Sequence, residues 1–371
     1  MEKSETSWFI VDEIIIVDTG STDETLFVAR QYTSLIFHFS WQDDFSLARN
    51  FALEKASKDW VLIIDADERL TSSSHKALRQ LLQATPPDIP QVFNFLAVAS
   101  NQQPLFTRAL FPRLSGFCFK GRVHETLRFN GQIPKQFHCS NIRYEHVVSQ
   151  ANKSLQKQKH YLQLLQLELE QPLPAWERVN YLQHLANAYQ ELGYCAQALD
   201  ALEEAYLLFK QTAYFNTDLF YLNLLKNLVM LCLSQYPLKP IQALIYAKEM
   251  TTLFPELSES WMCYAQTCFT NQRYLSALSI LDDFLSSSRN LSIVLHHSAL
   301  LLEARCWIGL SEFNTAHTLL KKLYQANPVD EVGLFLHFVN ILLKNTSELC
   351  HELKSFKKLT PFEASLLKKF I

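Results

Sequence analysis

The sequence predicts an α/β domain followed by an all-helical domain, and three observations support this fold class. Residues 1–148 alternate between short β-branched runs and short helical runs, which is typical of a sheet covered by helices. From about Ser149 the strand signal fades and leucines recur at helical spacing. The 371 residues include only 7 glycines, which favours helices over glycine-rich folds. We therefore expect two domains, residues 1–148 and residues 149–371.

The elements of the first domain follow one another in a regular order. Residues 12–17 read DEIIIV, a run suited to a buried strand, and the turn DTGSTD after it offers Thr22 or Asp23 as the cap of a helix. Ser46 is expected to cap the next helix, after a second strand. Alternation of this kind predicts a mostly parallel sheet with helices on both faces. The remaining predicted elements are a helix over 24–32, strands over 35–39, 60–64 and 92–99, and a helix over 72–84.

Alanines recur along the second domain at spacings of 45, 34 and 39 residues, at Ala198, Ala243, Ala277 and Ala316. Three of these four units also carry an alanine twelve positions earlier, at Ala186, Ala265 and Ala304. The unit around Ala243 breaks this rule. The pattern resembles tetratricopeptide repeats, which are helical hairpins of about 34 residues that stack and bind partners along one face. An irregular helical bundle is the alternative.

Composition excludes several classes of protein. Lys and Arg number 34 and Asp and Glu 37, and the resulting net charge of −3 argues against a nucleic-acid partner. No stretch reaches the roughly 18 uninterrupted apolar residues of a membrane span, and the first ten residues do not read as a signal peptide. The 8 cysteines contain no CxxC pair, so we expect reduced, buried thiols and a cytoplasmic location.

Carboxylates follow two of the predicted strands directly. Asp18 comes after IIIV, and Asp65 and Asp67 come after WVLII. Ligands of open α/β sheets bind outside the carboxyl ends of the strands. Two carboxylates two positions apart on a turn can reach one hard cation, and such a cation can bind a diphosphate. The sequence therefore predicts a metal-assisted diphosphate site at Asp65 and Asp67.

Four segments together resemble a family 2 glycosyltransferase. They are VDEIIIVDTGSTDET, FHFSWQDDFSLARNFAL and DWVLIIDADE within residues 11–68, and TRALFPRLSGFCFKGRVHETL at residues 107–127, which ends in a G-x-x-H-E motif. The chain is most similar to the bacterial subgroup that joins this domain to tetratricopeptide repeats. That subgroup includes peptide S-glycosyltransferases and lipooligosaccharide glucosyltransferases.

The resemblance implies a fold and an activity. The fold would be a Rossmann-like nucleotide-sugar domain followed by tetratricopeptide-like repeats. The activity would be that of an inverting hexosyltransferase that uses a UDP-sugar and Mn²⁺ or Mg²⁺. The acceptor would be a peptide, a protein or a lipid-linked glycan, and the repeats would present it or bind a protein partner.

The resemblance also implies roles for individual residues. Asp18 would lie beside the nucleoside, and Asp67, supported by Asp65, would contact the ribose, the metal and the diphosphate. Arg49 would face the nucleotide phosphates or brace the loop of residues 65–67. His124 is a candidate metal ligand, because a neutral imidazole commonly binds cations.

Glu125 is the candidate general base, with Glu68 as its rival, because inverting transfer needs one carboxylate to take the acceptor's proton. Each assignment has a structural alternative. Arg49 could pair with Asp43 or Asp44, and His124 could be a satisfied core or turn histidine. Glu125 could be a solvated loop carboxylate or could pair with Arg122 or Arg128.

The sequence departs from the family at its beginning. The family normally has a further strand and helix before the VDEIIIVDTGSTD segment, and only ten residues precede Val11 here. We therefore expect a domain that is incomplete at its N-terminus, with an exposed strand edge. This leaves two hypotheses: an active transferase, or a catalytically impaired one that acts as a helical-repeat scaffold. A dinucleotide or P-loop enzyme is disfavoured because the sequence contains neither GxGxxG nor GxxxxGK[ST].

Overall fold

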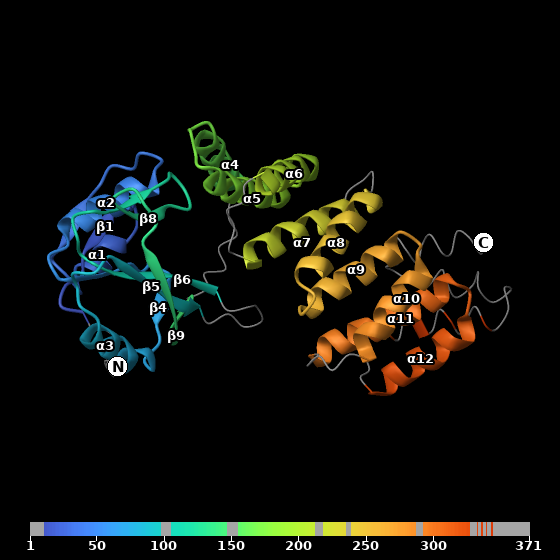
Figure 1. Cartoon of the computed structure of the whole chain (residues 1–371). Coiled ribbons are helices and arrows are strands. Elements are labelled where there is room, and N and C mark those ends of the chain that lie inside the picture. Colours follow the sequence, from blue (N-terminus) through green and yellow to red (C-terminus); the bar gives the residue numbers. More distant parts are fainter. Residues whose placement is uncertain are drawn as a thin grey trace. The chain divides into compact units, whose positions relative to one another are not determined.

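The structure is a computed structural model of the 371-residue chain (Figure 1). It describes residues 11–97, 105–146, 155–211, 218–234, 239–286 and 292–326, together with five single positions between 332 and 343. The end of the strand predicted over 92–99 lies outside these ranges, as do the first ten residues. The chain divides into two compact units, Met1–Leu173 and Pro174–Ile371.

The division between the units comes later in the chain than the domain boundary predicted after residue 148. The last strand ends at His146 and the next helix begins at Leu155. This helix belongs to the first unit, because its Glu168 accepts a hydrogen bond from the backbone N–H of Arg122, at 3.1 Å.

Strands and helices alternate at the beginning of the first unit, as the sequence predicts, but β4 is an additional short strand and five strands follow one another after α3. The elements before the sheet's longer strands are β1 (Ile16–Asp18), α1 (Thr25–Ala29), β2 (Ile36–His38), α2 (Phe45–Lys55), β3 (Trp60–Leu62), β4 (Glu68–Leu70) and α3 (Ser74–Ala84). The remaining elements are β5 (Gln91–Ala97), β6 (Leu105–Pro112), β7 (Phe117–Lys120), β8 (Thr126–Phe129), β9 (Lys135–His146) and α4 (Leu155–Leu169).

The expectation of one mostly parallel sheet is wrong. The main sheet has the order β3-β6-β5-β9-β4, and only β5 and β9 pair in parallel within it. β1 and β2 form a separate parallel pair, and β7 and β8 form an antiparallel hairpin. Strands β5 and β6 are joined by a short connection, which allows antiparallel pairing, whereas parallel pairing requires a long crossover.

The main sheet lies between two apolar clusters of side chains. Figure 1 shows the sheet with helices α2 and α3. Side chains on successive positions of a strand point to opposite faces. On one face Phe93 and Phe95 pack with Leu78 of α3, and on the other Val92 and Phe111 pack with the β7–β8 hairpin. Leu53 of α2 joins this second layer. Helices α2 and α3 therefore lie on opposite faces of the main sheet, in agreement with the prediction of a sheet covered on both sides.

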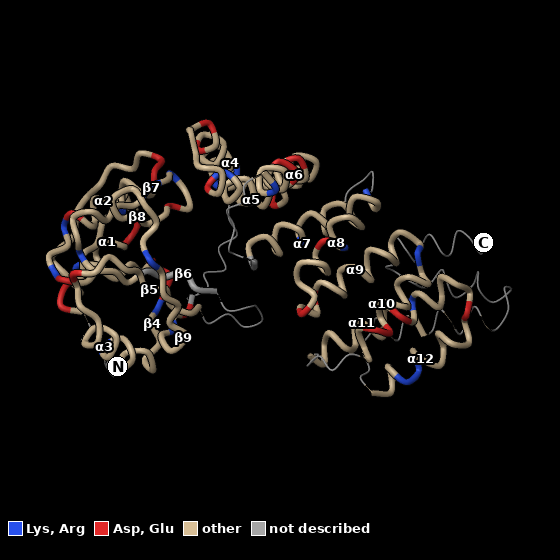
Figure 2. The backbone as a smooth tube through the Cα atoms, viewed as in Figure 1, with Lys and Arg blue, Asp and Glu red and all other residues tan. Residues whose placement is uncertain are grey.

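Within the described residues, β1 pairs only with β2, and β3 pairs only with β6. Both strands carry β-branched apolar runs, and each leaves one edge without a ladder partner. An open strand edge was expected here. Figure 2 shows acidic and basic residues interspersed along this unit, as the near-balanced charge predicts.

The second unit is a series of helical hairpins. Its helices bury small residues at the positions of the sequence repeat. The alanines that define the sequence repeat are all fully buried, with 0% exposure at Ala186, Ala198, Ala243, Ala265, Ala277, Ala304 and Ala316. The helices are α5 (Ala175–Glu191), α6 (Cys195–Gln211), α7 (Asp218–Ser234), α8 (Pro240–Leu253), α9 (Ser258–Thr270), α10 (Tyr274–Ser286), α11 (Ile293–Gly309) and α12 (Phe313–Ala326).

Three hairpins share one turn, which confirms that they are repeats of one unit. Gly193, Gln272 and Ser311 have positive φ angles of 78°, 59° and 65°. In each case the next residue donates its N–H to the carbonyl five positions earlier, at 2.8 to 2.9 Å. This left-handed closure is a common way to end a helix. The unit around Ala243 has Leu231, 2% exposed, where the others have the earlier alanine.

The cysteine expectation holds in part. The seven described cysteines are free thiols. Cys232, Cys268 and Cys306 are buried, but Cys118 is exposed because β7 turns alternate side chains to solvent. None of the helices in the described ranges has the length and apolarity needed to cross a bilayer.

Candidate active site

The loop after β3 presents two carboxylates and is closed by a third. The backbone N–H of Asp65 donates to Glu68 Oε2, and the N–H of Glu68 donates to the carbonyl of Asp65, each at 3.0 Å. Glu68 is only 8% exposed, whereas the side chain of Asp65 is 40% exposed and Asp67 is also exposed. The structure therefore uses Glu68 to shape the turn and leaves the two aspartates at its surface.

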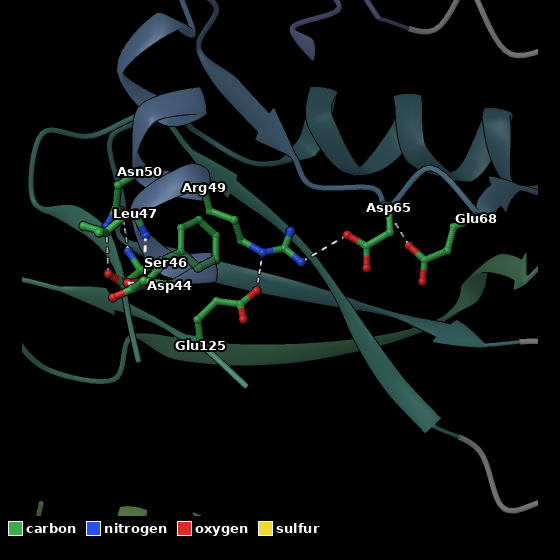
Figure 3. Close-up of polar contacts among 9 residues, drawn as sticks. Asp44, Ser46, Leu47, Arg49, Asn50, Asp65, Glu68 and Glu125 are labelled. Atoms are coloured by element: carbon green, nitrogen blue, oxygen red, sulfur yellow. Dashed lines mark hydrogen bonds and ion pairs between the residues drawn. The ribbon is translucent and has the colours of Figure 1, made fainter. Parts of the chain in front are cut away.

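Arg49 joins this loop to a distant segment (Figure 3). Its Nη2 lies 3.0 Å from Asp65 Oδ1, and its Nε donates to Glu125 Oε1. The three side chains are 21%, 40% and 12% exposed, so the ion pairs are largely shielded from water at Arg49 and Glu125. Three residues singled out from the sequence thus come together, although 76 positions separate Arg49 from Glu125.

The pairing of Arg49 differs from one alternative that its sequence neighbours suggested. Asp44 is the N-cap of α2: its Oδ1 accepts from the backbone N–H of Leu47 at 3.2 Å and from the hydroxyl of Ser46 at 2.6 Å. The prediction that Ser46 caps this helix is therefore wrong, since Ser46 lies in the first turn. Asp43 Oδ1 accepts from the indole N–H of Trp41 at 2.8 Å.

Asn50 fixes α2 against β7. Its side-chain amide donates to the carbonyl of Phe119 at 2.9 Å and accepts from the N–H of the same residue at 2.7 Å. The guanidinium of Arg49 lies 5.8 Å from the centre of the Phe119 ring, within the range of a cation–π contact. Sequence reasoning missed Asn50, because only its position beside Arg49 in the LARN segment marks it.

Asp18 lies in a different turn, at the end of β1. Its carboxylate accepts from the N–H groups of Gly20 and Ser21, at 3.3 and 3.1 Å, and His38 Nδ1 is 3.6 Å away. Hydrogen bonds from Ser21, with its side chain as the largest contribution, lower the pKa of Asp18 against the opposing effect of burial. Asp18 thus organises the DTGS turn and stays ionised there, and a nucleoside contact remains a prediction.

His124 sits immediately before Glu125 with a positive φ of 50°. Its Nε2 is hydrogen-bonded to the hydroxyl of Tyr161 on α4. Across the described ranges, His, Cys, Asp and Glu side chains do not gather in any group of three or more that could hold a metal ion. The structure therefore does not assemble Asp65, Asp67 and His124 into a ready protein cage for a cation.

Comparison with known protein families matches this part of the chain. Residues 8–120 match the family described as Glycosyl transferase family 2. The matched range contains Asp18, Arg49, Asp65 and Asp67, and it ends just before the loop that carries Glu125.

Several curated proteins are similar to parts of the chain. The SPbeta prophage-derived glycosyltransferase SunS of Bacillus subtilis is 25% identical over 223 residues, covering 52% of this chain and 51% of that protein. The lipopolysaccharide core biosynthesis glycosyltransferase LpsC of Rhizobium meliloti is 38% identical over 77 residues, covering 20% of this chain and 28% of LpsC. A TPR repeat-containing protein of Synechococcus elongatus is 40% identical over 93 residues, covering 25% of this chain and 22% of that protein.

The chain spans about half or less of the length of these three relatives. Among solved structures, a tetratricopeptide repeat protein from Parabacteroides merdae aligns with a TM-score of 0.43 at 17% identity, covering 58% of this chain and 79% of that one. The family match, the similarity to named glycosyltransferases and the repeated helical hairpins agree with one another. The chain carries a family 2 glycosyltransferase domain followed by a tetratricopeptide-like helical domain.

Proposed function

We propose that this chain transfers a sugar from a UDP-sugar to a peptide, protein or lipid-linked glycan, with inversion at the anomeric carbon. The observation that carries the proposal is the bridge from Asp65 through Arg49 to Glu125. It places a candidate donor-binding carboxylate and a candidate base on two nitrogens of one guanidinium. The free thiols of the described residues support a cytoplasmic setting.

In this proposal Glu125 is the general base and Glu68 is not. Glu125 is largely shielded from water, with 12% of its side chain exposed, and one of its oxygens is held by Arg49. A base must be oriented and within hydrogen-bond reach of the acceptor proton. Glu68 Oε2 instead accepts from the backbone of its own turn, which favours a structural role.

The residues of the Asp65 loop fit a divalent cation of the predicted kind. Mg²⁺ is usually bound by one or two carboxylates together with substrate phosphates, and Mn²⁺ also prefers oxygen ligands. Asp67, supported by Asp65, supplies such carboxylates without a third protein ligand. When bound, the cation would neutralise the charge that develops on the departing diphosphate. His124 is held through its Nε2 by the hydroxyl of Tyr161, and we assign the metal to the two aspartates.

The helical domain would hold the acceptor. Stacked helical hairpins form extended surfaces that bind peptides and proteins. A catalytically impaired scaffold is the second candidate. Strands β1 and β2, which carry Asp18, form a sheet of their own, whereas the Asp65 loop follows β3 of the main sheet. This separation favours the scaffold.

Thermal unfolding with UDP and Mn²⁺ tests the proposal. At a hundred times its dissociation constant, a ligand that binds only the folded protein adds about 2.7 kcal/mol of stability. We expect UDP with Mn²⁺ to stabilise the chain, and Asp67→Asn to abolish the metal-dependent part of that effect. Asp88→Asn, at an exposed position, is the matched control and should keep it.

Two results would contradict the proposal. One is the absence of any stabilisation by UDP with Mn²⁺, which would favour the scaffold. The other is an equal, metal-independent shift in the native chain and in Asp67→Asn, which would remove the aspartate loop from donor binding.

A further inference from the structure

Helix α4 directs three polar side chains at the loops that carry the candidate active site. His160 Nε2 lies 2.9 Å from Asp43 Oδ1, just before α2. The next residue, Tyr161, is hydrogen-bonded through its hydroxyl to His124. One helix thus reaches both the segment that begins α2 and the loop that carries Glu125.

The first two contacts fall on unusual backbone conformations. Asp43 and His124 have φ angles of 56° and 50°, in the left-handed region that side chains other than glycine rarely adopt. Such residues persist where the surrounding structure holds them. His160 and Tyr161 contact the side chains of these two residues. Helix α4 thus holds the residue before Asp44, the helix cap, and the residue before Glu125.

The third contact fixes the loop itself. Glu168 is 6% exposed, and its Oε2 accepts from the backbone N–H of Arg122 at 3.1 Å. The carbonyl of Arg122 accepts from the N–H of Phe45, the first residue of α2, at 2.8 Å. The loop is therefore held on one side by α4 and on the other by the helix that carries Arg49.

We infer that Tyr161 and Glu168 are positioning residues for Glu125. They hold residues 122–124 so that the Glu125 carboxylate stays against Arg49 and faces the acceptor. This inference rests on the proposed function of Glu125 as the base. A displacement of a reacting group by about 1 Å lowers rates by about a hundredfold. A loosened loop should therefore lower kcat.

The test uses four variants of the full chain: Glu168→Ala, Glu168→Gln, Tyr161→Phe and, as the matched control on the same helix, Lys159→Ala. The amide oxygen of Gln can still accept the Arg122 N–H, and Phe keeps the ring of Tyr161 without its hydroxyl. Lys159 is exposed.

The first measurement is hydrogen exchange of the backbone amides of residues 117–129, which requires no activity. We expect faster exchange at residues 122–125 in Glu168→Ala and Tyr161→Phe, and native exchange in Glu168→Gln and Lys159→Ala. Unchanged exchange in both Glu168→Ala and Tyr161→Phe would overturn the inference.

The second measurement is hydrolysis of UDP-glucose with Mn²⁺, in which water replaces the acceptor and UDP and glucose are released. We expect Glu168→Ala to lower kcat by about tenfold with KM for UDP-glucose unchanged, and Glu168→Gln to restore it. A raised KM with native kcat, or equal damage by Ala and Gln, would contradict a positioning role. If the native chain hydrolyses no UDP-glucose, this reaction does not report on Glu125, and the exchange measurement decides whether α4 holds the loop. The proposed function is tested separately, by the stabilisation with UDP and Mn²⁺ described above.

Discussion

Arg49 lies 3.0 Å from Asp65, from Nη2 to Oδ1, while its Nε contacts Glu125. Two different nitrogens of one planar group thus hold a carboxylate each. This arrangement fixes the distance between the Asp65 loop and the loop of Glu125, and it makes the geometry of the guanidinium as important as its charge.

Replacing Arg49 with Lys should therefore damage the site although the charge is kept. A single ammonium cannot reproduce the fork that reaches Asp65 and Glu125 together. We expect kcat/KM for UDP-glucose hydrolysis to fall by at least about tenfold, or ~1.4 kcal/mol. Arg30→Lys, at an exposed position on the end of α1, should have native kinetics. Native kinetics in Arg49→Lys would show that the fork is not needed.

The two candidate bases respond differently to an amide substitution. Glu125→Gln should lower kcat by roughly 10² to 10⁴, because an amide cannot take the acceptor proton. Glu68→Gln should keep most of the activity, because its amide oxygen can still accept the N–H of Asp65. Steady-state rates with the same donor compare them. The reverse order of losses would transfer the role of base to Glu68.

Stability at low pH should depend on Asp18. Hydrogen bonds from Ser21, then Gly20, lower the pKa of Asp18 in the folded chain. A carboxylate with a lowered pKa contributes stability above its unfolded pKa of about 3.9, and this contribution is lost as pH falls through the folded pKa. Asp18→Asn should therefore flatten the decline of stability below about pH 4, relative to the native chain.

Urea unfolding midpoints between about pH 6 and pH 2.5 measure this effect. Asp12→Asn, at an exposed position, is the control. If stability falls as steeply at low pH in Asp18→Asn as in the native chain, the Asp18 carboxylate does not contribute to the pH dependence of stability.

Asn50 should be a large contributor to the stability of the first unit. Asn50→Ala removes both hydrogen bonds to the backbone of Phe119 and leaves its N–H and carbonyl without those partners. Such losses in part-buried sites cost about 1–3 kcal/mol. Urea unfolding should show this loss, and Glu54→Ala, exposed on the same helix, should change stability by less than about 0.5 kcal/mol. Equal losses of stability in the two variants would contradict the role of Asn50 in holding α2 against β7.

The shared hairpin turn of the helical domain predicts opposite effects at two equivalent positions. Gly193 has a φ of 78° and open space around its Cα, so Gly193→Ala should destabilise through backbone strain alone, by about 1 kcal/mol. Gln272 has a φ of 59°, so Gln272→Gly should be neutral or stabilising. Thermal unfolding of both variants measures this, and a loss of stability in Gln272→Gly similar to that in Gly193→Ala would argue against a common turn.

Local and periodic features were read correctly from the sequence. The strands around IIIV and WVL lie where β-branched runs predict them. The alanines that define the sequence repeat are all buried. Each of these depends on residues close together in the chain or on a helical period. The direction of the strands in the main sheet could not be predicted from local patterns. Strand pairing there depends on the length of the connections and on the packing of both faces of the sheet.

The sequence by itself determined the first alternating strands and helices, the phase of the helical repeat and the placing of carboxylates after strands. Only the tertiary structure decided that Arg49 meets Glu125, that Asn50 binds Phe119, 69 positions away, and that α4 contacts the loop of His124. The physical reason is that these contacts join segments with no common local pattern. They form only when the sheet and its covering helices bring distant parts of the chain within hydrogen-bond distance.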